Sequence, residues 1–144
     1  LDFKKFHPAG SLSKKLKTAE DLMTIKEKIP FINENEIIKD GLKVLNSKKL
    51  GVLIARNSKK ETTGIFTDGD IKRAIQKNSE ILKKRIKLFM TKNPISIEKD
   101  TLAVKALSIM NEKKITCLCI FKKNNKKKTS GILHIHQILE TNTN

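Results

Sequence analysis

Residues 35–54 read NEIIKDGLKVLNSKKLGVLI, and residues 100–120 read DTLAVKALSIMNEKKITCLCI. The second stretch repeats the first, and its most visible landmark is NSKKL at residues 46–50, which returns as NEKKI at 111–115. A repeat of this length indicates two copies of one supersecondary unit related by pseudo-symmetry. We therefore expect function to lie in a cleft between the copies rather than in a catalytic motif inside either one.

The spacing of apolar residues predicts the same elements in both copies. Each has a helix with one buried face, capped by Asn35 in the first copy and by Asp100 in the second. The expected buried positions are Ile37, Ile38, Gly41, Leu42 and Leu45 in the first helix, and Leu102, Ala103, Ala106, Leu107 and Met110 in the second. The apolar runs 50–55 and 115–121 are too short for helices and predict buried strands.

A hairpin and a second helix complete each copy. Gly64-Ile65-Phe66 lies in the partner strand of the first hairpin, and Gly131-Ile132-Leu133 in that of the second. A helix over 68–78 follows, with its buried face predicted at Ile71, Ala74 and Ile75, and another follows near 135–140. Each copy is thus predicted to run strand–helix–strand–strand–helix, an α/β (α+β) fold with the two copies packed pseudo-symmetrically.

The predicted division of the chain follows from the repeat. Residues 1–18 are polar and contain breakers, which is typical of a linker or the tail of a preceding domain. The first copy is placed at 19–78, a connector at 79–89 and the second copy at 90–142. Because the chain of 144 residues begins at Leu1 rather than Met, we expect it to be part of a longer protein.

Composition narrows the function classes. The formal net charge of +16 would suit nucleic acid or an anionic membrane, but nearly all basic residues are scattered Lys, and only Arg56, Arg73 and Arg85 are Arg. Six Phe and no Trp or Tyr leave few stacking platforms for single strands. No apolar run approaches the roughly 20 residues of a membrane span, and no signal peptide is visible. We predict a cytoplasmic protein with no nucleic-acid or membrane partner.

Two cysteines, Cys117 and Cys119, lie one residue apart in a predicted strand. Their separation along an extended strand is unsuitable for an unstrained disulfide, which fits a reducing compartment. Together with His134 and His136 they offer one arrangement for zinc, although zinc motifs usually carry their Cys pairs on turns. We favour small buried side chains and predict no metal.

The segment whose residues are best suited to bind a ligand is 64–70, where a predicted strand ends and a predicted helix begins. Free backbone N–H groups and the positive end of the helix dipole favour anions at such a point. Thr67 offers a hydroxyl to a phosphate oxygen, whereas Asp70 is suited to accept hydrogen bonds from the two vicinal hydroxyls of a ribose. Thr-x-x-Asp is equally the pattern of a capping box that only completes the helix start. The sequence leaves both interpretations open, and the doubled architecture favours binding.

The second copy differs at the same positions. His134 takes the place of Thr67, Ile135 that of Asp68, and Gln137 that of Asp70. The carboxylate is lost there, so Gln137 offers only a neutral hydrogen bond. His134 is suited to contact an anionic ligand or, as an isolated histidine usually is, to be partly buried at a helix start.

The element order and the Gly-x-x-Thr-x-x-Asp motif resemble a tandem pair of CBS (cystathionine-β-synthase) domains over about residues 19–142. The resemblance implies a Bateman module that binds adenine nucleotides or related ligands and dimerises into a disc. It implies that Thr67 faces phosphate and Asp70 ribose. We include Asp68, Arg73 and His134 among the expected ligand-binding residues.

The start of the chain adds a narrower resemblance. The run FHPAGSL at residues 6–12 and the KKL that follows it resemble the junction in arabinose-5-phosphate isomerases, where a sugar isomerase (SIS) domain precedes the CBS pair. His7 matches the junction histidine of that family, while Ala9 and Ser13 replace two of its glycines. These enzymes interconvert ribulose 5-phosphate and arabinose 5-phosphate in lipopolysaccharide biosynthesis. No isomerase domain is present in these 144 residues, so we expect no catalysis by them and no catalytic residue among them.

Three hypotheses follow. The first is a regulatory CBS pair of a sugar-phosphate isomerase, which requires no cofactor and senses AMP, ADP, ATP or CMP-activated 3-deoxy-manno-octulosonate. The second is a structural dimerisation module without a ligand. The third, disfavoured by the composition, is binding of nucleic acid through lysines.

Overall fold

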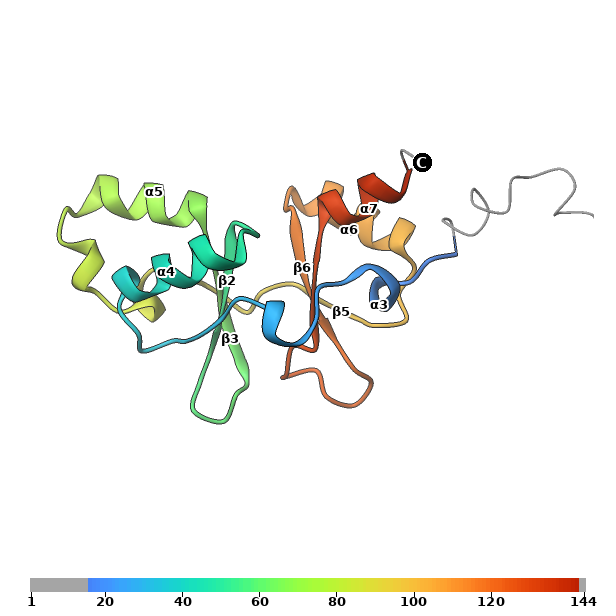
Figure 1. Cartoon of the computed structure of the whole chain (residues 1–144), viewed down its shortest axis with the longest axis horizontal. Coiled ribbons are helices and arrows are strands. Elements are labelled where there is room, and N and C mark those ends of the chain that lie inside the picture. The colour runs from blue at the N-terminus through green and yellow to red at the C-terminus, as the bar shows by residue number, and fades with distance from the viewer. Residues whose placement is uncertain (1–15, 143–144) are drawn as a thin grey trace, which may run out of the picture. The chain divides into compact units, whose positions relative to one another are not determined.

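The computed structural model describes residues 16–142, which form two compact units. One unit is residues 26–95, and the other joins residues 16–25 to residues 96–142. Both units combine helices with a small sheet, so the predicted α/β (α+β) class is confirmed (Figure 1). Within these units, residues 16–25 lie with the second copy and residues 79–95 with the first, and the predicted division of the sequence at 19–78, 79–89 and 90–142 stays a prediction.

The 26–95 unit is built around a four-stranded sheet in the order β1-β2-β3-β4. Strands β1 and β2 are parallel and are connected through α4, while β2 and β3 form an antiparallel hairpin that leads directly into α5. The elements are η1 (Lys26–Lys28), β1 (Phe31–Asn33), α4 (Ile38–Lys48), β2 (Val52–Arg56), β3 (Thr62–Thr67), α5 (Asp68–Lys77), η2 (Ile81–Lys83), η3 (Ile86–Leu88) and β4 (Thr91–Lys92).

The other unit repeats this plan with a three-stranded sheet in the order β5-β6-β7. Strand β5 is parallel to β6, and β6 and β7 form the second antiparallel hairpin. The elements are α3 (Ala19–Leu22), β5 (Ser96–Glu98), α6 (Ala103–Lys113), β6 (Cys117–Phe121), β7 (Gly131–His134) and α7 (Ile135–Asn142). The predicted order strand–helix–strand–strand–helix is therefore confirmed in both copies.

Helices α4 and α6 do not begin as predicted. Their N-cap residues are Ile37 and Leu102, neither of which makes a side-chain capping bond, so the predicted caps Asn35 and Asp100 are wrong. A backbone carbonyl from a distant segment satisfies the first N–H instead. The Ile38 N–H donates to the carbonyl oxygen of Lys84 (2.9 Å), and the Ala103 N–H to that of Lys17 (2.7 Å). Tertiary contacts thus supply what a capping side chain would supply in an isolated helix.

Each unit has its own cluster of buried apolar residues. Ile38, Gly41 and Leu45 on α4 and Ala103, Ala106 and Met110 on α6 are buried as predicted. Two predicted core positions are wrong: Ile75 is 50% exposed and Leu102 is 40% exposed. Leu102 is the N-cap of α6 rather than part of its buried stripe, and Ile75 lies beside the buried Ala74 but faces outward.

The two repeated glycines, Gly64 and Gly131, are each covered by a methionine. A Cβ at Gly64 would collide with Met90 Sδ, and a Cβ at Gly131 would collide with Met23 Sδ. The residue after each methionine is a threonine that pairs with the strand carrying the glycine: Thr91 with Ile65, and Thr24 with Ile132. The Met-Thr dipeptide is therefore a further part of the repeat, which the sequence analysis missed.

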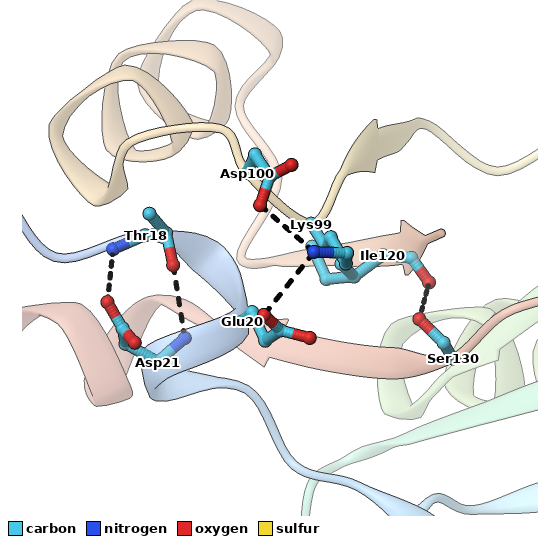
Figure 2. A network of polar contacts seen from close by, with 7 residues as sticks. All are labelled: Thr18, Glu20, Asp21, Lys99, Asp100, Ile120 and Ser130. Atoms are coloured by element: carbon cyan, nitrogen blue, oxygen red, sulfur yellow. Dashed lines mark hydrogen bonds and ion pairs between the residues drawn. The ribbon is translucent and has the colours of Figure 1, made fainter. Parts of the chain in front are cut away.

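Residues 16–25 are fastened to the 96–142 part of their unit by polar contacts (Figure 2). Helix α3 begins with a capping box, in which the Thr18 N–H donates to Asp21 Oδ2 (2.8 Å) and the Asp21 N–H to Thr18 Oγ1 (3.3 Å). Lys99 Nζ lies 3.5 Å from Glu20 Oε1 and 3.1 Å from Asp100 Oδ1. The hydrogen bond with Asp100 and the negative charges of both carboxylates raise the pKa of Lys99.

The buried strand β6 leads to a first prediction, on its two thiols. Burial raises the pKa of Cys117 well above its ordinary value and that of Cys119 to about 11, so the native protein holds almost no thiolate at neutral pH. We expect Ellman's reagent to react with neither thiol on mixing at neutral pH and with both after denaturation. Rapid labelling of native protein would contradict this packing of β6.

Candidate functional site

The predicted ligand-binding residues of the first copy lie together where β3 passes into α5. Thr67 is the last residue of β3 and the N-cap of α5, with an extended backbone (φ −109°) that turns the chain into the helix. The Asp68 N–H donates to the carbonyl oxygen of Gly51 (3.3 Å), which ties this helix start to the residue before β2. Thr67, Asp68, Asp70 and Arg73 thus occupy the first two turns of one helix.

A complete capping box forms at this helix start. The Asp70 N–H donates to Thr67 Oγ1 (3.2 Å), and the Thr67 N–H donates to Asp70 Oδ2 (2.9 Å). Arg73 Nη2 lies 2.5 Å from the other carboxylate oxygen, Asp70 Oδ1. The Asp70 side chain is 11% exposed, whereas that of Arg73 is 67% exposed. The carboxylate is therefore held in place by the backbone, and its arginine partner lies largely in solvent.

The capping interpretation of Thr-x-x-Asp is thus realised, but it does not distinguish a binding site from a plain helix start. The same box occurs at Thr18 and Asp21 of α3. Each carboxylate oxygen of Asp70 accepts one described hydrogen bond, and a carboxylate oxygen has capacity for two. The box consequently leaves acceptor capacity for a ligand hydroxyl.

His134, the remaining predicted residue, belongs to the other unit, where β7 passes into α7. The His134 N–H donates to Gln137 Oε1 (2.8 Å), which reproduces the backbone half of the capping box with an amide in place of a carboxylate. His134 Nδ1 accepts from the His136 N–H (3.2 Å), and the two imidazole rings stack with centroids 4.8 Å apart. His134 is therefore a helix-capping residue, partly buried, as its isolated occurrence in the sequence suggested.

The stacked histidines lead to a second prediction, on pH dependence. Burial, followed by the positive charge of His136, lowers the pKa of His134 below its ordinary 6.5. The unfolded state then binds more protons than the native state as pH falls through 6.5, so stability decreases on acidification and is fully present above that value. Urea denaturation measures the free energy of unfolding at about pH 7.5 and about pH 5.5. We expect this free energy to fall less between the two pH values in His134→Thr than in the parent protein. Equal losses would contradict the assignment.

Across residues 16–142, no group of three or more His, Cys, Asp and Glu side chains is arranged to hold a metal ion, so the zinc alternative at Cys117, Cys119, His134 and His136 has no support. No helix in the same range is long and apolar enough to cross a membrane. His7 lies outside the described residues.

The structure also identifies Thr24 as a polar residue that the sequence analysis missed. Thr24 Oγ1 accepts a hydrogen bond from Gln137 Nε2 (2.9 Å), across a sequence separation of 113 residues. The signal that could have drawn attention to it is the repeated Met-Thr dipeptide at 23–24 and 90–91.

Curated proteins with similar sequences include an uncharacterised protein of Helicobacter pylori (strain J99), 38% identical over 143 residues, and an uncharacterised protein of Rickettsia prowazekii, 33% identical over 138 residues. The arabinose 5-phosphate isomerase KdsD of Salmonella typhimurium is 31% identical over 139 residues. In each case the match covers 96% of this chain but only 42% of the relative. The chain thus spans less than half the length of the relatives it matches.

Solved structures share the fold at lower sequence identity. The CBS-domain protein ATU1752 of Agrobacterium tumefaciens superposes with a TM-score of 0.78 at 17% identity, covering 88% of this chain and 94% of that one. CBSX2 in complex with AMP gives 0.74 at 22% identity, covering 88% and 96%. The CBS domain pair of protein MJ0100, in complex with 5-methylthioadenosine and S-adenosyl-L-methionine, gives 0.78 at 22% identity, covering 89% and 97%.

A family assignment comes from a sequence model of the CBS domain, which matches twice, at residues 19–77 and 84–142. The two matches together take in most of the chain and agree with the repeat, the element order and the superposed structures. This chain belongs to the CBS domain family and consists mainly of two CBS domains in tandem.

Proposed function

We propose that this chain is the regulatory CBS pair of an arabinose-5-phosphate isomerase, and that it binds an adenine nucleotide or a nucleotide-activated sugar at the start of α5. Similarity to KdsD along 96% of the chain supports the parent enzyme. The adenosine compounds bound to CBSX2 and MJ0100 support the ligand class. Occupancy would regulate the isomerase by favouring one arrangement of its domains, which requires different affinities for the arrangements.

The observation that carries the ligand proposal is the carboxylate of Asp70. It is nearly buried, fixed by the Thr67 N–H, and retains acceptor capacity for the two hydroxyls of a ribose. The Asp68 and Asp70 N–H groups already donate to Gly51 and Thr67, so a phosphate at this helix start would meet the Gly69 N–H and the positive end of the helix dipole. Gly69 keeps this backbone approachable because it has no side chain.

Arg73 and Thr67 have matching roles in this proposal. The exposed guanidinium of Arg73 is paired with Asp70, and in this proposal it turns to meet a phosphate or a further anionic group. The Thr67 hydroxyl accepts from the Asp70 N–H and still has its own proton to donate to a phosphate oxygen. Asp68, exposed at the first helical position, is the least constrained of the proposed ligand-binding residues.

A thermal-shift panel tests the proposal. It compares AMP, ADP, ATP, S-adenosylmethionine and CMP-activated 3-deoxy-manno-octulosonate. A ligand that binds only the folded state raises the melting temperature, so we expect one of these compounds to raise it and the shift to disappear in Asp70→Ala. If no compound changes the melting temperature of the parent protein, the sensor function is wrong for these ligands.

The activity of the parent protein is the second half of the proposal. A chain that contains this pair and a preceding SIS domain should interconvert ribulose 5-phosphate and arabinose 5-phosphate, with His7 at the junction matching the family's histidine. The compound that stabilises the pair should change the isomerisation rate of that full chain. An unchanged isomerisation rate at saturating ligand would contradict the proposed regulatory role but not the proposed ligand binding.

One observation favours the alternative of a ligand-free dimerisation module. The polar groups at the start of α5 already satisfy one another, as they do at the start of α3, so no ligand is needed to complete them. Large apolar side chains such as Ile75, Leu88 and Val104 are also exposed. Dimerisation that persists in a Thr67→Ala, Asp70→Ala variant, with unchanged activity of the intact enzyme, would support this alternative.

A further inference from the structure

The first described residues of the chain lie against the start of helix α6. The Ala103 N–H donates to the carbonyl oxygen of Lys17 (2.7 Å), and Thr18 forms an antiparallel bridge with Leu102. The chain therefore enters the unit of residues 16–25 and 96–142 directly beside the first turn of α6.

Three large apolar side chains next to this entry point are exposed. Leu16, which precedes Lys17, is 61% exposed. Leu102 and Val104, on either side of Ala103, are 40% and 48% exposed. We call Leu16, Leu102 and Val104 the entry patch, because each of them is next in sequence to a residue of the hydrogen bond at the entry point.

The first copy has the same hydrogen bond but surrounds it with lysines. There the Ile38 N–H donates to the carbonyl oxygen of Lys84 (2.9 Å). The residue before Lys84 is Lys83 and the residue after Ile38 is Lys39, and both are exposed. The hydrogen bond itself consequently does not require exposed apolar neighbours, so the apolar residues of the entry patch need another explanation.

The backbone next to the entry patch is fixed, and its border is polar. The Ala19 N–H donates to the carbonyl oxygen of Thr101 (2.8 Å), and the Glu20 N–H to that of Lys99 (3.0 Å). The ammonium of Lys99 also lies between the carboxylates of Glu20 and Asp100 (Figure 2). An apolar centre with a polar rim is the usual anatomy of a protein interface, and a surface that is already ordered loses little entropy on docking.

Continuity of the chain indicates which partner covers the entry patch. Any domain that precedes this chain is tethered beside the patch, through residues 1–15, which span at most about 50 Å. A short tether gives such a domain a high effective concentration at the patch, so a small apolar contact is sufficient for docking. A second copy of the chain lacks this advantage.

We propose that the entry patch docks the domain that precedes it in the full protein, through an apolar surface of that domain. The existence of a preceding isomerase domain rests on the proposed function, whereas the exposure of the patch does not. Docking at α6 gives the CBS pair a point of contact with the isomerase in addition to the covalent linker.

Thiol labelling of the full chain tests the docking. Val104→Cys places a thiol in the entry patch, and Leu88→Cys is the control at a position that is 63% exposed in the other unit. The native Cys117 and Cys119 are buried, and peptide mass spectrometry identifies which thiol has reacted. We expect maleimide to label Val104→Cys about tenfold more slowly in the full chain than in the 144-residue chain, and Leu88→Cys equally fast in both.

A second substitution makes the labelling test specific. Leu16→Lys copies Lys83 of the first copy and should restore rapid labelling of Val104→Cys in the full chain. Equal labelling of Val104→Cys in the two chains, or no effect of Leu16→Lys, would overturn the docking. Protection of Val104→Cys in the 144-residue chain that disappears on dilution would also overturn it, because a second copy would then cover the patch.

An isomerase assay on the full chain separates this proposal from the proposed function. Protection of Val104→Cys in a full chain that does not isomerise arabinose 5-phosphate would support the docking and contradict the proposed function. Unprotected Val104→Cys in an active isomerase would overturn the docking alone.

Discussion

Replacing Phe66 by alanine is expected to lower the free energy of unfolding by about 3–5 kcal/mol. Phe66 is fully buried in β3, one residue before the capping residue Thr67. It belongs to the cluster that includes Ile38, Leu53 and Ile71. Removing the ring would leave a cavity between the sheet and the helices α4 and α5, because close-packed surroundings relax only partly. Urea denaturation followed by far-UV circular dichroism measures the loss.

Two further variants make the Phe66 prediction specific. Phe66→Leu keeps most of the volume and should cost much less than the alanine variant. Leu133→Ala removes the buried residue at the equivalent position of the other copy, in the strand β7. It should cost about 2–5 kcal/mol. A loss below about 1 kcal/mol for Phe66→Ala would contradict the core described for the 26–95 unit.

Asp70→Asn is expected to abolish stabilisation by the nucleotide while the helix start persists. The asparagine amide retains an oxygen that can accept from the Thr67 N–H, but the charge that Arg73 pairs with and that a ribose diol would meet is lost. A ligand at 100 times its dissociation constant stabilises the native state by about 2.7 kcal/mol. Thermal unfolding with and without AMP should show this gain in the parent protein and not in Asp70→Asn.

The matched control for this variant is Asp21→Asn. Asp21 closes the same kind of capping box on α3, and nothing in the proposal places ligand there. It should retain the full response to AMP, which separates the loss of a capping carboxylate from the loss of a binding group. If Asp70→Asn responds to AMP as the parent does, the carboxylate is a cap only and the proposed ribose contact is wrong.

Local patterns in the sequence were sufficient for the repeat, the α/β class, the order of elements and the capping box at Thr67 and Asp70. These features depend on residues a few positions apart: on helical periodicity, on short apolar runs, or on a reciprocal pair of hydrogen bonds between residues i and i+3. They were also sufficient to show that His134 and Gln137 replace the first pair. The proposed ligand roles of Thr67, Asp68, Asp70, Arg73 and His134 remain predictions.

Tertiary structure alone decided which segments belong together. Residues 16–25 join the unit of residues 96–142 through pairing and side-chain contacts across more than a hundred residues, as between Gln137 and Thr24. The predicted caps of α4 and α6 were wrong for the same reason. Carbonyl groups of residues distant in the sequence accept hydrogen bonds from the first N–H groups of these helices. Exposure of Ile75 likewise depends on which face the rest of the unit covers. Local conformation depends on neighbouring residues and can be predicted from the sequence. Burial and long-range hydrogen bonds form only when segments distant in the sequence pack together, so only the tertiary structure decides them.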